Sequence, residues 1–157
     1  MRIRPARADE AADLSELAFR AKAHWGYSDA FMAACRAELT VAPEAVSAGG
    51  HQVIEDGDRA CGFYALRRVS PTAMELEALF VDPPRIGEGF GRALLEHALE
   101  SCAAAGIERL VIQADPHSVE FYQRAGAVEI AERASGSIAG RMLPLLEIRI
   151  KTAPAEG

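Results

Sequence analysis

The sequence of 157 residues lacks any uninterrupted apolar run long enough to cross a bilayer, and its first residues, Met1 to Pro5, lead into no apolar signal region. We therefore expect a cytoplasmic protein without membrane partners. Cysteine is also scarce: Cys35, Cys61 and Cys102 are odd in number, widely spaced and set among apolar residues. This pattern favours unpaired thiols in a reducing compartment over disulfides or a metal site, so no metal is expected.

An excess of positive charge is missing as well, because 23 Asp and Glu residues outnumber 17 Lys and Arg residues and give a net charge of −6. Proteins that hold nucleic acid need a basic face, so nucleic acid is not an expected partner. The charge is compatible with a cationic amine as substrate. The length suits one domain, which we place at residues 1–151, followed by a short C-terminal tail at 152–157.

Three alternating glycines, Gly87, Gly89 and Gly91, lie between an apolar strand that ends at Val81 and a helix that follows at once. Glycine lets the backbone approach a ligand without a Cβ in the way. The start of the helix adds unpaired N–H groups and the positive end of the helix dipole. The segment therefore predicts a site for phosphate or pyrophosphate.

Three other interpretations of these glycines are weaker. A P-loop is disfavoured because no Lys follows the glycines. A dinucleotide site is disfavoured because the spacing is G-x-G-x-G, and because neither Glu108 nor Asp115 ends the next strand at the usual distance. A tight turn without a ligand stays open, although three alternating glycines cost much chain entropy.

The segment resembles the acyl-coenzyme A loop of the GNAT superfamily of N-acyltransferases, which has the motif [RQ]-x-x-G-x-[GA] after a strand ending L-x-V-x-P. Gly89 and Gly91 fill the two glycine positions, and residues 79–83 match the end of the strand. Ile86 stands where the motif has Arg or Gln, and Arg85 lies one residue earlier. This departure weakens a side-chain contact to the pyrophosphate and leaves the backbone contacts intact.

Residues 115–126 resemble a second segment of the same family, N-x-x-A-x-x-[FY]-Y-x-x-x-G-[FA]. The residues by themselves predict a short helix, with Asp115 as the N-cap, Pro116 at the first helical position and Gly126 at C′. Phe121 is expected in the core. Asp115 replaces the family's usual Asn, which contacts the cofactor arm. The Asp115 carboxylate either makes a weaker contact with the cofactor or serves only as the helix cap.

Hydrophobic periodicity predicts an α/β fold with the order strand, two helices, three strands, helix, strand, helix, two strands. The expected strands are 3–8, 53–55, 60–68, 74–81, 109–114, 128–133 and a final one around 146–150. Asp9 and Ser28 are expected to cap the first two helices, residues 43–50 to form a connection, and the helix after the glycines to end at Gly106. The resemblance implies the GNAT fold, a mixed and mostly antiparallel sheet of about seven strands flanked by helices, with two splayed parallel strands at its centre.

The resemblance also implies a function, the transfer of an acetyl group from acetyl-coenzyme A to a primary amine by direct attack in a ternary complex. The alternative is a coenzyme A binding or sensing module of the same fold without turnover. The positions implied to bind the cofactor are Leu79, Phe80, Val81, Ile86, Gly87, Glu88, Gly89, Phe90, Gly91, Asp115 and Tyr122.

Two residues are candidates for the chemistry. Tyr122 stands at the family's tyrosine position and would protonate the departing thiolate, since a phenol with a pKa of about 10 is protonated at neutral pH. Glu77 is the candidate general base; it shares a strand face with Glu75, and both carboxylates could equally be solvated there. His117 is a further option for the base.

The acceptor, a small-molecule or peptide amine, is expected between the first two helices and the turn before the last strand. Trp25 and Tyr27 lie where the helical pattern breaks and could form an aromatic wall. Arg141 follows the turn 135–140 and could bind an acceptor carboxylate. The sequence does not decide the oligomeric state, and a homodimer is one option.

Overall fold

The computed structural model describes residues 1–151, and the expected tail at 152–157 lies outside the described residues. Seven strands form one sheet in the order β1-β2-β3-β4-β5-β7-β6. All neighbouring strands are antiparallel except β4 and β5, which are parallel. The strands are β1 (Arg2–Pro5), β2 (His51–Asp56), β3 (Arg59–Ser70), β4 (Ala73–Val81), β5 (Arg109–Gln113), β6 (Val128–Ala134) and β7 (Met142–Arg149). The expected mixed sheet is therefore confirmed.

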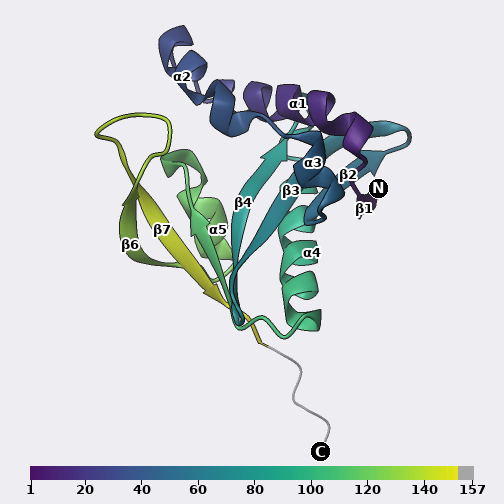
Figure 1. The fold of residues 1–157 in the computed structure, drawn as a ribbon, viewed down its shortest axis with the longest axis vertical. Helices are drawn as coiled ribbons and strands as arrows, with labels where there is room; N and C mark the ends of the chain where they lie inside the picture. The colour runs from purple at the N-terminus through teal and green to yellow at the C-terminus, as the bar shows by residue number, and fades with distance from the viewer. Residues whose placement is uncertain (152–157) are drawn as a thin grey trace, which may run out of the picture.

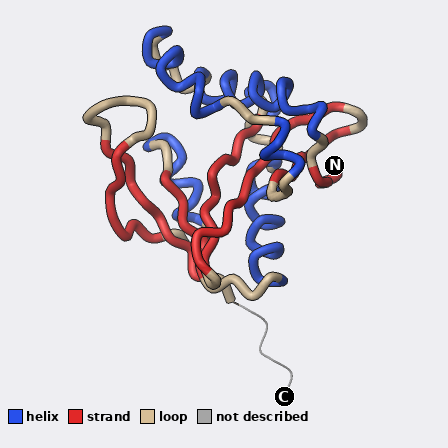
Figure 2. Tube along the Cα trace, in the orientation of Figure 1, coloured by secondary structure: helices blue, strands red, loops and turns tan. Residues whose placement is uncertain are grey.

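Helices cover both faces of this sheet, as Figures 1 and 2 show. On one face, the apolar residues of α1 and α2 pack on Val53 and Phe63. On the other face, α4 and Tyr122 of α5 pack with Ile54, Leu110 and Leu146. The helices are α1 (Ala11–Ala23), α2 (Asp29–Leu39), α3 (Pro43–Ser47), α4 (Phe90–Ala104) and α5 (Val119–Arg124).

The two parallel strands diverge after a short paired stretch. Residues 73–75 of β4 pair with residues 109–111 of β5, and the register ends there. In Figure 1 the two halves of the sheet meet at the bottom and open toward α1 and α2. The pairing of β3 with β4 contains a bulge in β4: Leu66 faces Leu76 whereas Ala65 faces Ala78, which leaves Glu77 as the extra residue. The carboxyl ends of β4 and β5 are left unpaired with each other.

Several expectations about single elements need correction. The connection 43–50 contains the one-turn helix α3, which Pro43 begins. The first strand ends at Pro5 rather than Ala8, and a 3₁₀ turn over Ala8–Glu10 precedes α1. Phe121 is only half-buried, whereas its neighbour Tyr122 is 6% exposed and belongs to the core cluster. The Ser28 cap is confirmed, because its hydroxyl accepts from the Phe31 amide at 3.1 Å.

Among residues 1–151, no helix is long and apolar enough to cross a membrane. The three cysteines are buried and unpaired.

Candidate active site

The glycine segment leads directly into α4. Gly87 and Gly89 have φ values of +88° and +86°, a left-handed conformation that disfavours residues with a side chain. Gly89 is the N-cap of α4. A Cβ at either position would meet no protein atom within 4 Å, so the space beside them is open. A Cβ on Gly91 would lie 3.5 Å from Val81 and 3.6 Å from the Phe121 ring, which puts the start of α4 beside β4 and α5.

The backbone of this segment offers unpaired donors. Within residues 1–151, the N–H groups of residues 87–92 donate to no backbone acceptor, and Ala93 is the first to do so, to Gly89 O at 3.1 Å. The Ile86 N–H differs from our expectation, because it donates to Pro83 O at 3.2 Å. Six adjacent amides at the start of a 15-residue helix form a site that suits an anion.

Arg85 stabilises the segment from the side of the β2–β3 hairpin. Its guanidinium lies 2.8 Å from Asp56 and 2.7 Å from Glu88, and 4.7 Å from the centre of the Phe90 ring. These partners raise its pKa above the ordinary value, the Glu88 carboxylate most. Arg85 is therefore paired with two carboxylates. The backbone amides are the groups in this segment that are left to contact an anion.

Two further amides face the divergence between β4 and β5. The Asp82 amide donates to Cys61 O on β3 at 2.8 Å. Because donors alternate along an antiparallel ladder, the Phe80 amide also points to β3, whereas those of Leu79 and Val81 point toward β5. The β4–β5 pairing ends at Glu75, so β5 does not accept from them. They can donate to a carbonyl oxygen placed between the two strands.

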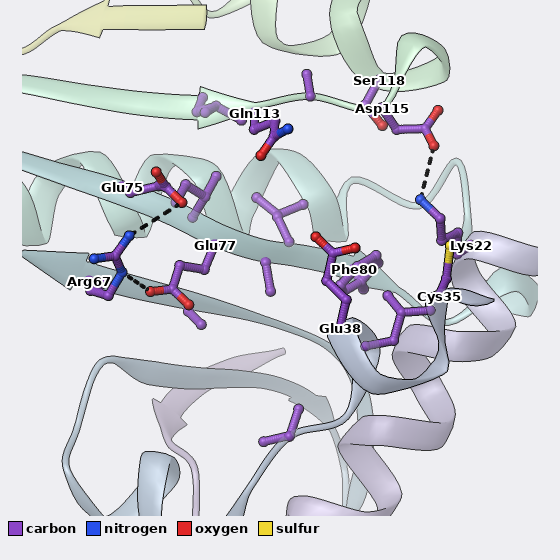
Figure 3. Close-up of a pocket in the computed structure, with 18 of the residues that line it drawn as sticks. Lys22, Cys35, Glu38, Arg67, Glu75, Glu77, Phe80, Gln113, Asp115 and Ser118 are labelled. Atoms are coloured by element: carbon purple, nitrogen blue, oxygen red, sulfur yellow. Dashed lines mark hydrogen bonds and ion pairs between the residues drawn. The ribbon is translucent and has the colours of Figure 1, made fainter. Parts of the chain in front are cut away.

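A cavity of about 430 Å³ opens beside these strands, and Figure 3 shows part of its lining. Its walls come from α1, α2, α3, β2, β3, β4, the end of β5, α5, β7 and the turn before β7. The cavity brings together six residues that the sequence singled out: Glu77, Leu79, Phe80, Asp115, Tyr122 and Arg141. Residues 86–91, Val81, Trp25 and Tyr27 are not part of its lining.

Tyr122 lines the cavity from α5. Burial raises the pKa of its phenol above the ordinary value of 10. The hydroxyl is therefore protonated at neutral pH and is available as a proton donor toward a more basic group.

The two carboxylates of β4 are both bound to arginines. Glu77 lies 2.5 Å from Arg67, and Glu75 lies 3.8 Å from Arg67 and 3.0 Å from Arg133. In Figure 3 the Arg67 side chain reaches both carboxylates. Glu77 has the more exposed side chain of the two, so it is the more accessible to a substrate.

Asp115 forms the centre of a polar cluster at the end of β5. One carboxylate oxygen accepts from the amide of His117 at 2.9 Å and lies 2.8 Å from its Nδ1; the other accepts from Tyr27 at 2.7 Å and Lys22 at 3.3 Å. Burial raises the pKa of Asp115, but these donors outweigh burial and lower it to about 2. Of the two roles expected for Asp115, the cap is confirmed, and its oxygens are occupied by protein donors.

The residues expected at the acceptor site lie at the edge of this cluster. Arg141 donates to the Tyr27 hydroxyl at 3.0 Å and lies 3.8 Å from Asp115. Trp25 is 42% exposed and stacks on His117 with ring centres 4.9 Å apart. The structure thus brings Tyr27 and Arg141 together, and it links Trp25 to them only through His117.

Several charged or polar residues of the cavity were not expected from the sequence: Lys22, Glu38, His51, Arg67 and Gln113. They come from five separate elements, and strand pairing and helix packing bring them together. No local motif marks them. Among residues 1–151, no group of three or more His, Cys, Asp or Glu side chains is placed to hold a metal ion.

Comparisons with known proteins agree with this architecture. A model of the acetyltransferase (GNAT) family matches residues 11–127. A peptidyl-lysine N-acetyltransferase, YjaB of Salmonella typhimurium, is 33% identical over 95 residues, which span 60% of this chain and 60% of that protein. The matched part is thus less than two thirds of that relative's length.

Solved structures share the whole fold at low sequence identity. A GCN5-related N-acetyltransferase from Rhodopseudomonas palustris has a TM-score of 0.79 at 20% identity, with 95% of each chain covered. The PaiA N-acetyltransferase from Thermoplasma acidophilum, in complex with coenzyme A, has a TM-score of 0.73 at 17% identity, with 94% of this chain and 98% of that chain covered. The family match extends over three quarters of the sequence, and the chain belongs to the acetyltransferase (GNAT) family.

Proposed function

We propose that this protein transfers the acetyl group of acetyl-coenzyme A to a primary amine, by direct attack of the amine in a ternary complex. The observation that carries the proposal is the row of unpaired amides at residues 87–92, at the start of α4 and beside the end of β4. These donors suit a pyrophosphate. Membership of the family and the coenzyme A bound to the PaiA structure support the same cosubstrate.

The acyl group would lie where β4 and β5 diverge. The amides of Leu79 and Val81 point into this region and would donate to the thioester oxygen as it gains negative charge. Preorganised backbone donors of this kind lower a barrier by about 3 to 4 kcal/mol each. Phe80 would contribute its side chain only, since its amide faces β3.

The acceptor would enter the cavity from the side of α2 and the 135–141 turn. Glu38 and Glu77 place carboxylates on opposite elements of this cavity, a distribution that suits a cationic amine such as a lysine side chain. The relative YjaB is named a peptidyl-lysine N-acetyltransferase, which supports a lysine acceptor. Trp25, Tyr27 and Arg141 would contact the rest of the acceptor.

The reaction requires a neutral amine and a protonated leaving group. Glu77 would take a proton from the ammonium, and the amine nitrogen would attack the thioester carbon. The carbon–sulfur bond then breaks, and Tyr122 would protonate the thiolate. Tyr122 is one of the residues that line the cavity, and burial raises the pKa of its phenol, so the hydroxyl is protonated at neutral pH.

One observation favours the alternative, a coenzyme A binding module without turnover: Glu77 is held by Arg67 at 2.5 Å and is not an unoccupied base. Calorimetric titration with acetyl-coenzyme A and with NADH, followed by thiol-release assays on lysine peptides, polyamines, amino acids and aminoglycosides, separates the possibilities. Acetyl-coenzyme A binding with thiol release supports the proposal. Binding without release by any acceptor supports the module, and absence of binding refutes both.

A further inference from the structure

Glu38 stands at the opening of the cavity, near the end of α2. The residue is exposed and belongs to the cavity lining. In Figure 3 its carboxylate points away from α2 and toward the sheet. One carboxylate oxygen, Oε2, accepts from the Ser137 hydroxyl in the turn before β7, and among the described residues no donor reaches the other oxygen, Oε1. Oε1 is therefore free to accept from a ligand.

The turn that faces Glu38 leaves Oε1 uncovered. An added Cβ on Gly136 would lie 3.5 Å from this oxygen, so the missing side chain of glycine keeps that side of the carboxylate open. The amides of Ser137 and Ile138 donate to the Ser135 hydroxyl, so these backbone donors are used within the turn. The turn thus holds one oxygen of Glu38 and leaves the other accessible.

The other carboxylates that line the cavity are each held by cations of the protein. They are Glu75 and Glu77, bound by Arg67 and Arg133, and Asp115, bound by Lys22 and Arg141. Within residues 1–151, Glu38 has no positively charged partner, and the side chain that it contacts, Ser137, is neutral. Glu38 is therefore the carboxylate of this cavity whose charge the protein does not balance by a direct contact.

His51, which also lines the cavity, does not supply the missing positive charge. Burial lowers the pKa of its imidazole below the ordinary value of 6.5, so the ring is neutral at pH 7. Its Nδ1 is buried and has no hydrogen-bond partner among the described residues, so it makes no contact with Glu38. A positive charge beside Glu38 has to come from a bound molecule.

We propose that Glu38 binds a second positive charge on the acceptor, so that the protein selects amines that carry a further ammonium or guanidinium group. The inference rests on the proposed function and narrows its acceptor class. The reacting amine must lose its proton before it attacks, whereas a guanidinium stays charged throughout the reaction. The second group therefore keeps its ion pair with Glu38 at the opening of the cavity, and the reacting nitrogen is free to reach the region where β4 and β5 diverge.

Matched acceptors that differ in one charge test the proposal. One pair consists of end-capped peptides with a lysine next to either arginine or its neutral isostere citrulline. The other pair is an aminoalkyl guanidine and the aminoalkyl urea of the same length, which separates a peptide source of the charge from a small-molecule source. In at least one pair the wild type should use the charged acceptor about 2- to 5-fold better in kcat/KM, as expected for an exposed ion pair. Added salt should reduce this ratio toward one. A ratio of one in both pairs at low salt would overturn the proposal.

Three variants locate the selectivity at the Glu38 charge. Glu38→Gln should raise the KM of the charged acceptor to that of the neutral one without changing kcat, because the amide keeps an oxygen for Ser137 but has no charge. Glu38→Lys should invert the preference, because it repels the charged acceptor. Ser137→Ala keeps the carboxylate and should keep the wild-type ratio.

Glu44→Gln is the matched control. Glu44 is an exposed glutamate on the neighbouring helix α3 and does not line the cavity, so its variant should also keep the wild-type ratio. If Ser137→Ala abolishes the selectivity as Glu38→Gln does, Glu38 acts by ordering the turn, which contradicts the proposal.

The two proposals fail in different ways. A wild-type chain that binds no acetyl-coenzyme A, or that acetylates none of these acceptors, contradicts the proposed function. A wild-type chain that acetylates charged and neutral acceptors equally well, or a folded Glu38→Gln variant that keeps the wild-type preference, contradicts the role of Glu38 alone.

Discussion

The hydroxyl of Tyr27 donates to Oδ2 of Asp115 across 2.7 Å, which joins the segment between α1 and α2 to the end of β5. The two residues are 88 positions apart in the sequence. Arg141 donates to the same hydroxyl at 3.0 Å, so the turn before β7 joins the contact. Three separate segments at the edge of the cavity are thus positioned by one carboxylate.

Asp115→Asn should remove stability in a pH-dependent way. The pKa of Asp115 is about 2 in the folded chain and 3.8 ordinarily, so below pH 3.8 the unfolded chain binds a proton that the folded chain does not yet bind. The stabilisation is complete above pH 3.8, amounts to about 2 kcal/mol, and is lost as pH falls toward 2. Denaturant unfolding of wild type and variant at pH 6 and pH 2.5 measures it. A difference in free energy that is the same at both pH values would contradict this assignment.

Gly89→Ala should weaken acetyl-coenzyme A binding. A side chain at φ +86° strains the loop and moves the amides at the start of α4. Loss of one charged hydrogen bond, about 1.5 to 3 kcal/mol, raises Kd by roughly 10- to 150-fold in calorimetry. Gly57→Ala is the control, because Gly57 also has a positive φ and open space around its Cβ but lies in the β2–β3 turn. Equal Kd values for the two folded variants would count against the phosphate site.

Tyr122→Phe should lower kcat by roughly 10² to 10⁴-fold and leave the Kd of acetyl-coenzyme A unchanged, because the proton is needed only as sulfur gains charge. The control is Tyr64→Phe, another buried tyrosine, whose hydroxyl contacts His97 at 2.7 Å on the α4 side of the sheet. Single-turnover rates measure both. If Tyr122→Phe matches the wild type when chemistry limits the rate, Tyr122 has only a packing role.

Arg141→Ala should raise the KM of a carboxylate-bearing acceptor by an amount worth roughly 1.5 to 3 kcal/mol, with acetyl-coenzyme A binding unchanged. An amidated analogue of the same acceptor should show no such change. Tyr27→Phe is the comparison, because it removes the hydroxyl to which Arg141 donates and keeps the guanidinium. If both variants impair both acceptors equally, Arg141 orders the turn and does not bind a carboxylate.

Much of the fold was predictable because its signals are local. The alternating glycines before α4, the Ser28 cap, the Asp-Gly turn of the β2–β3 hairpin and the final strand each depend on a few neighbouring residues. The order of burial of Phe121 and Tyr122 was predicted wrongly: Phe121 is half-buried and packs against the core cluster, whereas Tyr122 is buried within it. Helical spacing alone does not say which side of a short helix meets the sheet.

The sequence by itself determined the family, the mixed sheet and the glycine-rich start of α4 with its unpaired amides, since these follow from consecutive residues with fixed backbone preferences. Only the tertiary structure decided the composition of the cavity. The bulge at Glu77, the pairing of Arg67 with two glutamates, the Tyr27–Asp115 contact and the unpartnered Nδ1 of His51 depend on strand register and helix packing between distant segments. Register is set by how whole faces bury their apolar residues, and no local pattern encodes which polar side chains then meet.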